Sequence, residues 1–374
     1  MPKGDNSLAG MSGEIRAEYG RPNREVLMDD AKRLRHFASD NNSGICPEVW
    51  AALEEANVGH VTGYGDDPWT AKAKQAVQDL FETDCEVFFV FNGTAANALA
   101  VASMCDSYHS VIACNFSHVE TDECNAPGFF APGVKMNPVN GENGKIAPAA
   151  VDRAARARRD VHASMPRVVS LTQATELGTV YTPEELAAIS KTARELGLYV
   201  HMDGARFANA VASLGVKPRA ISWEAGIDVL SLGGTKNGLA GGDAVVFFNK
   251  QLAQNFLYRC KQSGQLPSKM RFIAAQWIGL LRDGAWLRNA KNANQAAVLL
   301  ESKLRGLPGV RIFYPCQANA VFVDMPRAVF DGLHQRGWHF YTDVGPHGAR
   351  LMCSWDSTAE DVEAFVRDVV DLSK

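Results

Sequence analysis

Short apolar runs alternate with helix-like stretches between residues 70 and 249 of this 374-residue chain, and this alternation restricts the folds open to it. The expected strands are 87–91, 110–114, 167–171, 198–202, 228–232 and 244–249. The expected helices are 70–81, 94–104, 148–158, 183–196 and 206–214. Strands and helices in alternation are typical of βαβ units. The sequence therefore predicts an α/β fold with a mostly parallel sheet sandwiched by helices.

The pattern changes after residue 249. Residues 250–306 are mostly helical, and short strand-like runs then alternate with helical stretches. Those strands are expected at 309–313, 319–324, 338–343 and 349–353, with helices at 327–336 and 358–372. A chain of this length exceeds the usual size of one hydrophobic core. We predict four parts: an N-terminal arm (1–36) with a short helix near 26–35, a large domain (37–265), connecting helices (266–306) and a small α+β domain (307–374).

Composition excludes several classes of partner. The net charge is −4, so nothing in the bulk charge favours nucleic acid or an anionic membrane. No apolar run is long enough to span a bilayer, and the first 30 residues lack the apolar middle of a signal peptide. The eight cysteines are scattered without a CxxC pair or matching histidine spacing, which predicts neither disulfides nor a metal site and indicates a reducing compartment, the cytoplasm.

Two apolar runs each deliver a residue suited to cofactor chemistry. Val-His-Met-Asp-Gly-Ala-Arg (200–206) ends in Asp203, and Asp-Val-Leu-Ser-Leu-Gly-Gly-Thr-Lys-Asn-Gly (228–238) carries Lys236 into a glycine-rich turn. Pyridoxal phosphate needs a lysine for its Schiff base and an acid beside its ring nitrogen. Burial lowers the pKa of an amine, which then attacks an aldehyde more readily. The alternatives are a plain Asp-Gly turn and a solvated loop lysine.

Two further segments extend this pattern. Phe-Asn-Gly-Thr-Ala-Ala-Asn (91–97) follows a strand, so Gly93 could turn the chain while Thr94 caps a helix whose amides bind a phosphate. A helix cap without a ligand is the alternative. His118 lies just past another strand, where a histidine is either structural or able to stack on a pyridine ring and take part in proton transfer.

Seven short motifs resemble, in their order along the chain, those of the L-threonine aldolase family. They are Phe-Ala-Ser-Asp-Asn (37–41), Tyr-Gly-Asp-Asp-Pro (64–68), Asn-Gly-Thr (92–94), Ser-His (117–118), Asp-Gly-Ala-Arg (203–206), Thr-Lys (235–236) and Ala-Arg-Leu (349–351). This family consists of pyridoxal phosphate enzymes with the aspartate-aminotransferase-like fold (fold type I). The resemblance implies a seven-stranded-type sheet in the large domain and a homo-oligomer, dimer or tetramer.

The resemblance also implies a role for each matching residue. Lys236 would carry the cofactor, Asp203 would bind its ring nitrogen, Gly93 and Thr94 its phosphate, and His118 would stack on the ring. Ser39, Arg206 and Arg350 would hold the carboxylate of the amino acid. Tyr64 and Asp67 would lie in a loop that reaches a neighbouring subunit, and Arg271 would contact the phosphate across that interface.

The implied reaction is cleavage of L-threonine, L-allo-threonine and related β-hydroxy-α-amino acids to glycine and an aldehyde. His118, a water molecule or the cofactor phosphate could take the β-hydroxyl proton. Thr-Gln-Ala-Thr-Glu-Leu-Gly (172–178) replaces the family's commoner Glu-Asn-Thr-His-Asn, which leaves the threo/erythro preference open. A β-eliminating lyase or aminotransferase would share Lys236, Asp203 and the phosphate site, and a non-catalytic regulator is a more distant alternative.

Overall fold

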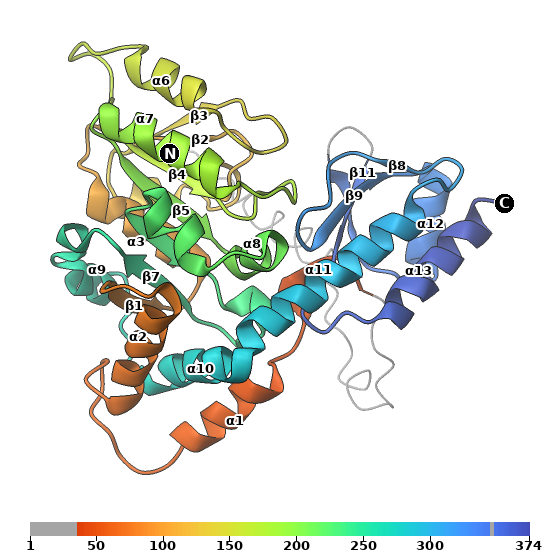
Figure 1. Cartoon of the computed structure of the whole chain (residues 1–374), viewed down its shortest axis with the longest axis horizontal. Helices are drawn as coiled ribbons and strands as arrows, with labels where there is room; N and C mark the ends of the chain where they lie inside the picture. The colour runs from red at the N-terminus through yellow and green to blue at the C-terminus, as the bar shows by residue number, and fades with distance from the viewer. Residues whose placement is uncertain (1–35, 345–347) are drawn as a thin grey trace, which may run out of the picture. The chain divides into compact units, whose positions relative to one another are not determined.

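A seven-stranded sheet forms the centre of the larger part of the chain (Figure 1). The computed structural model describes residues 36–344 and 348–374, so the expected arm and its helix lie outside the described residues. The strands follow the order β1 (Glu86–Val90), β7 (Asp243–Phe247), β6 (Val229–Leu232), β5 (Tyr199–Gly204), β4 (Met165–Thr172), β2 (His109–Cys114) and β3 (Lys135–Val139). From β6 to β3 every neighbouring pair is parallel, whereas β7 runs antiparallel to β6 and β1. The predicted mostly parallel α/β sheet is confirmed.

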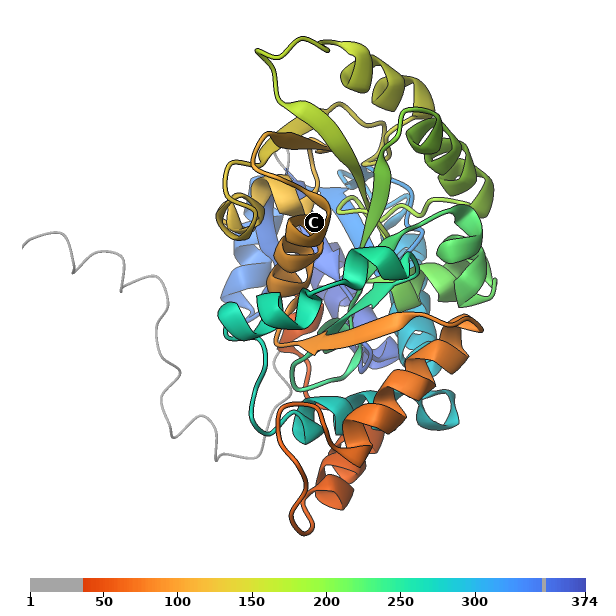
Figure 2. The ribbon, with the colours of Figure 1, turned by 90° about the vertical axis from the view of Figure 1, so that its left-hand side faces the viewer.

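Helices cover both faces of this sheet. They are α1 (Pro47–Ala56), α2 (Pro68–Phe81), α3 (Gly93–Met104), α4 (His118–Thr121), α5 (Ala126–Phe130), α6 (Pro148–Arg156), α7 (Pro183–Glu195) and α8 (Phe207–Leu214). The helix α7 begins with a capping box between Thr182 and Glu185. Figure 2 shows α3 (brown) and α7 (green) on opposite sides of the strands.

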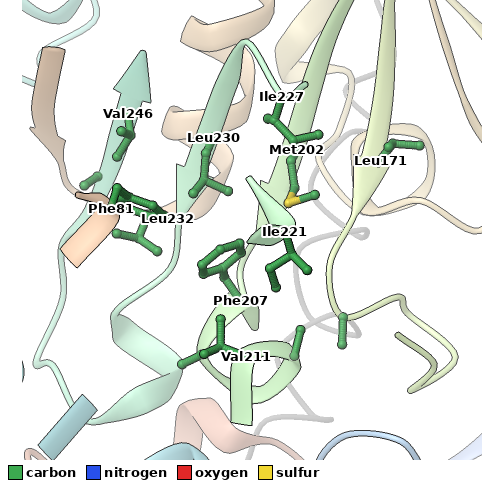
Figure 3. Close-up of a cluster of buried hydrophobic side chains, with 14 of the residues drawn as sticks. Phe81, Leu171, Met202, Phe207, Val211, Ile221, Ile227, Leu230, Leu232 and Val246 are labelled. Atoms are coloured by element: carbon green, nitrogen blue, oxygen red, sulfur yellow. The ribbon is translucent and has the colours of Figure 1, made fainter. Parts of the chain in front are cut away.

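Neighbouring residues of each strand alternate between two cores, as the pleat requires. Val229 and Val245 pack with α3, whereas Leu230 and Val246 pack with α2, α7 and α8. Figure 3 shows part of the second core, where Phe207 of α8 lies against Leu230 and Leu232. Because both faces are buried, the central strands are mostly apolar, with single polar residues such as His201 and Ser231 buried among them, and the sequence shows them clearly.

A four-stranded antiparallel sheet forms the C-terminal part. Its order is β10 (Tyr341–Val344), β11 (Gly348–Met352), β9 (Ala320–Asp324) and β8 (Arg311–Ile312), with α12 (Arg327–Gln335) and α13 (Ala359–Leu372) packed on it. The helices α9 (Phe256–Gln262), α10 (Arg271–Leu281) and α11 (Ala285–Leu304) precede it. Figure 1 shows α11 running from the region of α10 to this small sheet.

Two details bear on the predicted domain limits. Phe37 is fully buried in the C-terminal core, although the prediction assigns it to the large domain. Helix α11 contributes Trp286 to the large core and Leu300 to the small one, as a connecting helix would. The division into parts stays a prediction.

Within residues 36–344 and 348–374, no helix combines the length and apolar character needed to cross a bilayer.

Candidate active site

A cavity of about 210 Å³ lies where the sheet, the N-terminus of α3 and the lysine turn meet. Six of the predicted site residues line it: Lys236, Asp203, His118, Gly93, Thr94 and Arg206. Parallel strands bring their carboxyl ends to one edge of a sheet, and ligands bind there in open α/β folds. His118 follows β2, Asp203 lies at the end of β5, and Lys236 follows β6. The three residues therefore come together at this edge of the sheet.

Asp203 is almost fully buried, and both of its oxygens are held. Oδ1 accepts from the Ala205 backbone N–H at 2.9 Å, and Oδ2 accepts from the Asn97 amide at 2.8 Å. Two donors stabilise a buried carboxylate and fix its orientation. Asn97 lies on α3 and was not predicted as a site residue.

His118 belongs to a second hydrogen-bonded pair. Its Nδ1 lies 2.8 Å from Glu123 Oε1, which also accepts from the Asn97 amide at 2.8 Å. This hydrogen bond to Glu123 raises the pKa of His118 above its ordinary value, and the nearby Asp203 charge adds to the effect. His118 is therefore biased towards imidazolium, a donor through both ring nitrogens.

His118, Glu123 and Asp203 also present atoms within 4.8 Å of one another, a spacing that could suit a metal ion. The Asn97 amide nitrogen donates to both carboxylates. A cation between the carboxylates would face these N–H groups, so the hydrogen-bonded network is the better interpretation of the cluster.

We expect Glu123→Gln to lower the pKa of His118, because the amide removes the negative charge that stabilises imidazolium. Histidine ring resonances followed by NMR from pH 5 to 9, assigned with His118→Gln, would measure this. Glu120→Gln is the matched control, since Glu120 is an exposed carboxylate on the same short helix. A His118 midpoint that moves equally in both variants, or in neither, would contradict the assignment.

Lys236 lies in a 3-10 turn, Thr235–Asn237, directly after β6. Burial lowers the pKa of its amine, and the positive charge of Arg206 lowers it further. The neutral amine is the nucleophilic form. Asp243 holds the turn in place, because its Oδ1 accepts from the backbone N–H groups of Gly234 (2.8 Å) and Thr235 (3.2 Å).

The glycines around Lys236 are required by protein packing as well as by space for a ligand. A Cβ at Gly233 would lie 2.5 Å from the Ala205 carbonyl oxygen, and one at Gly234 would overlap Leu239. The lysine turn thus packs directly against the chain that follows Asp203. This contact fixes the two functional segments relative to each other.

The predicted phosphate site differs in detail from expectation. Asn92, not Thr94, caps α3: its Oδ1 accepts from Ala95 N–H at 2.9 Å. Gly93 is the first helical residue and does not adopt a left-handed backbone. The first-turn amides of Gly93 and Thr94 lack intrahelical acceptors and remain suited to an anion.

Arg206 is paired within the protein. Its Nε donates to Asp40 Oδ2 at 2.7 Å and its Nη2 to Oδ1 at 2.9 Å, and the Asn319 amide also donates to Asp40. Burial alone would raise the pKa of Asp40, but the Arg206 charge and these hydrogen bonds hold it below its usual range. The predicted carboxylate-binding role of Arg206 therefore rests on its remaining N–H groups.

Ser39 and Arg350 lie beside this pair but do not line the cavity. The Ser39 hydroxyl accepts from Asn41 N–H at 3.2 Å, and Asn41 lines the cavity. Arg350 donates to the Ala38 carbonyl at 3.4 Å, and its Nε is buried without a partner. Burial and the neighbouring Arg206 charge lower the pKa of Arg350. Two such cations favour an anionic ligand between them.

The three residues expected at a subunit interface do not line the cavity. Both oxygens of Asp67 accept from Thr70, at 2.9 and 2.7 Å, so Asp67 caps α2. Tyr64 is half-exposed, with Lys261 over its ring, and Arg271 donates to the Gly59 carbonyl at 3.1 Å. Their roles across an interface stay predictions.

Glu176 is a further acid in the cavity that the sequence did not single out. Its Oε1 accepts from His118 N–H at 2.8 Å and from the Thr172 hydroxyl at 2.9 Å. Burial, followed by the charge of Asp203, raises its pKa to about 7. Glu176 lies in the segment 172–178 quoted above, but a glutamate in a polar loop gives no signal by itself.

Comparisons with known proteins agree with this geometry. Residues 36–328 match the beta-eliminating lyase family. The chain is 57% identical to a low specificity L-threonine aldolase of a Pseudomonas species over 90% of this chain and 97% of that protein. It is 58% identical, over the same shares, to the enzyme of that name from Pseudomonas aeruginosa. A solved threonine aldolase from Leishmania major superposes with a TM-score of 0.85 at 28% identity, covering 91% of this chain and 99% of that one.

The fold and these matches define a pyridoxal-phosphate-dependent lyase of fold type I. Within that class, the chain belongs to the beta-eliminating lyase family and, inside it, to the L-threonine aldolases. The resemblance stated from the seven motifs is confirmed.

Proposed function

We propose that this chain is a low-specificity L-threonine aldolase that cleaves L-threonine, L-allo-threonine and related β-hydroxy-α-amino acids to glycine and an aldehyde. The observation that carries the proposal is one cavity holding an amine of lowered pKa, Lys236, and a doubly hydrogen-bonded carboxylate, Asp203. The identity of 58% to an enzyme of that name, over nearly its whole length, supports it.

The cavity fits pyridoxal phosphate on three counts. Lys236 would hold its aldehyde carbon, Asp203 its ring nitrogen, and the first-turn amides of α3 at Gly93 and Thr94 its phosphate. Buried polar atoms without partners, among them Asn97 Oδ1 and Glu123 Oε2, leave hydrogen-bonding capacity for a polar ligand. When bound, the cofactor supplies an electron sink for the bond that breaks at Cα.

The protein's own groups orient the substrate. Arg206 in the cavity lining, through the N–H groups that Asp40 leaves free, would hold the amino acid's carboxylate together with the neighbouring Arg350 and Ser39. Holding that group would restrict rotation about Cα and so orient the bond that breaks. His118, biased towards imidazolium, would stack on the ring and donate a hydrogen bond.

Incubating the purified chain with pyridoxal phosphate and L-threonine is expected to yield glycine and acetaldehyde in equal amounts. The name of the matching family favours β-elimination as the second candidate, which would give ammonia and a keto acid. A keto acid without ammonia would indicate transamination. Either of these products without glycine would reject the aldolase proposal, and a panel with L-allo-threonine and phenylserine would define the β-carbon preference.

We further propose that the enzyme is a homo-oligomer, dimer or tetramer, in which Tyr64, Asp67 and Arg271 face a neighbouring subunit's site. Large apolar side chains exposed on this side of the chain support an interface, including Tyr64, Leu257 and Tyr258.

We also propose the cytoplasm as its location. All eight cysteines are unpaired, which supports a reducing compartment.

A further inference from the structure

The protein hydrogen-bonds one carboxylate oxygen of Glu176 and leaves the other without a hydrogen-bond donor. Oε1 receives two hydrogen bonds, from the backbone N–H of His118 and the Thr172 hydroxyl, whereas Oε2 is buried with no hydrogen-bond partner. A buried carboxylate oxygen without a donor costs free energy. The two bonds to Oε1 fix the carboxyl group, so Oε2 is held at a defined place beside His118, ready for a donor from a ligand.

Several other titratable groups surround Glu176, and most of them are held by the protein. They are His118 and Glu123 near α4, Asp203 on β5, Arg206 before α8, Lys236 and Asp243 around the lysine turn, and Cys114 and Tyr181 on adjoining segments. Asp203 is bound by Asn97 and Ala205, and Asp243 by the lysine turn. His118 is paired through Nδ1 with Glu123 Oε1 at 2.8 Å.

We propose, on the basis of the proposed aldolase function, that Glu176 is the catalytic base that takes the proton of the substrate's β-hydroxyl group at its Oε2. Glu123 and Glu176 both line the cavity and each keeps a buried oxygen without a partner, but Glu123 already pairs with the His118 ring, whereas no titratable side chain is hydrogen-bonded to Glu176 among the described residues. A general base must lie within hydrogen-bond reach of the proton it abstracts, and Glu176 lines the same cavity as Lys236 and Asp203, where the cofactor and substrate would be held.

The step balances without a further reactant. The O–H bond of the β-hydroxyl breaks, its proton moves to Glu176 Oε2, and its electron pair forms the carbonyl π bond of the aldehyde. The Cα–Cβ bond breaks, and its pair stays with the glycine fragment. Glu176 then gives up a proton and returns to carboxylate, and Cα takes up one proton. The products are therefore glycine and the aldehyde.

Glu176→Gln tests the proposal, because the amide keeps an acceptor for His118 N–H and the Thr172 hydroxyl but cannot accept a proton. With the reconstituted holoenzyme, kcat for L-threonine cleavage is expected to fall by about 10²-fold or more. A base is active when deprotonated, so the kcat of the wild-type enzyme should rise with pH through about 7. This rising limb of the pH–rate profile should be lost in Glu176→Gln. Glu184→Gln, at an exposed site on α7, is the matched control.

A second measurement needs no activity. In cofactor-free protein labelled with ¹³C at glutamate carboxyls, one resonance should titrate near pH 7, and it should be missing in Glu176→Gln. The proposal is overturned if the variant keeps that resonance, or if it cleaves threonine within about threefold of the wild-type rate with the same pH limb. If the Gln variant does not fold, Glu176→Asp decides: a shifted limb supports the proposal and an unshifted limb overturns it. A wild-type chain that makes no glycine rejects the aldolase function itself, which the carboxyl titration does not test.

Discussion

Lys236→Ala is expected to reduce threonine cleavage by more than about 10⁴-fold, the largest effect of any substitution in this chain. The lysine supplies an amine of lowered pKa in the cavity, and under the proposed function alanine would leave the cofactor without its attachment. The loss should appear in kcat rather than in KM alone, since the missing group is needed for the chemistry and not only for binding substrate.

Two readouts separate this loss from unfolding. Wild-type protein treated with pyridoxal phosphate and borohydride should gain the mass of one reduced cofactor at Lys236, and Lys236→Ala should gain none. Lys191→Ala removes an exposed lysine from α7 and should behave as wild type in both assays. Turnover near the wild-type rate in Lys236→Ala would end the assignment of this residue.

The central fold was predictable because its central strands are buried on both faces and are therefore mostly apolar. The strand that was missed, β3, is an edge strand: it contains Pro138, and its residues are partly or fully exposed. An edge strand needs no continuous apolar run and tolerates proline, so neither usual signal is present. The helix α1 was also missed, although its buried residues Val49, Ala52 and Ala56 have helical spacing.

The site was predictable in part for a similar reason. Asp203 and Lys236 each follow an apolar strand, so their positions at the sheet edge follow from topology. Their partners do not: Asn97 reaches Asp203 across 106 residues, and Asp40 reaches Arg206 across 166. Such contacts are set by packing in three dimensions, and no local pattern encodes them.

Asp203→Asn is expected to weaken cofactor binding by about 10- to 10²-fold, since a charged hydrogen bond to the ring nitrogen is lost. Cleavage should slow by about 10²- to 10³-fold, because the negative charge no longer stabilises the charge that develops on the ring. The size of the residue is kept, and the new Oδ1 can still accept from Ala205 N–H. Cofactor titration followed by absorbance, with kcat measured at saturating cofactor, would give the two effects separately.

The hydrogen bonds of Asn97 make Asp203→Asn more disruptive than the small change in side-chain shape suggests. Asn97 now donates through one amide nitrogen to both Asp203 and Glu123. An amide at 203 would set a donor against that nitrogen, and turning Asn97 over would set its oxygen against Glu123. The charge of Asp203 also raises the pKa values of Glu176 and His118, so both should fall in the variant. The rise of kcat with pH, which the proposal assigns to deprotonation of Glu176, should then begin at lower pH. Asp79→Asn, an exposed site on α2, is the control, and unchanged cofactor affinity and rate in Asp203→Asn would remove Asp203 from the mechanism.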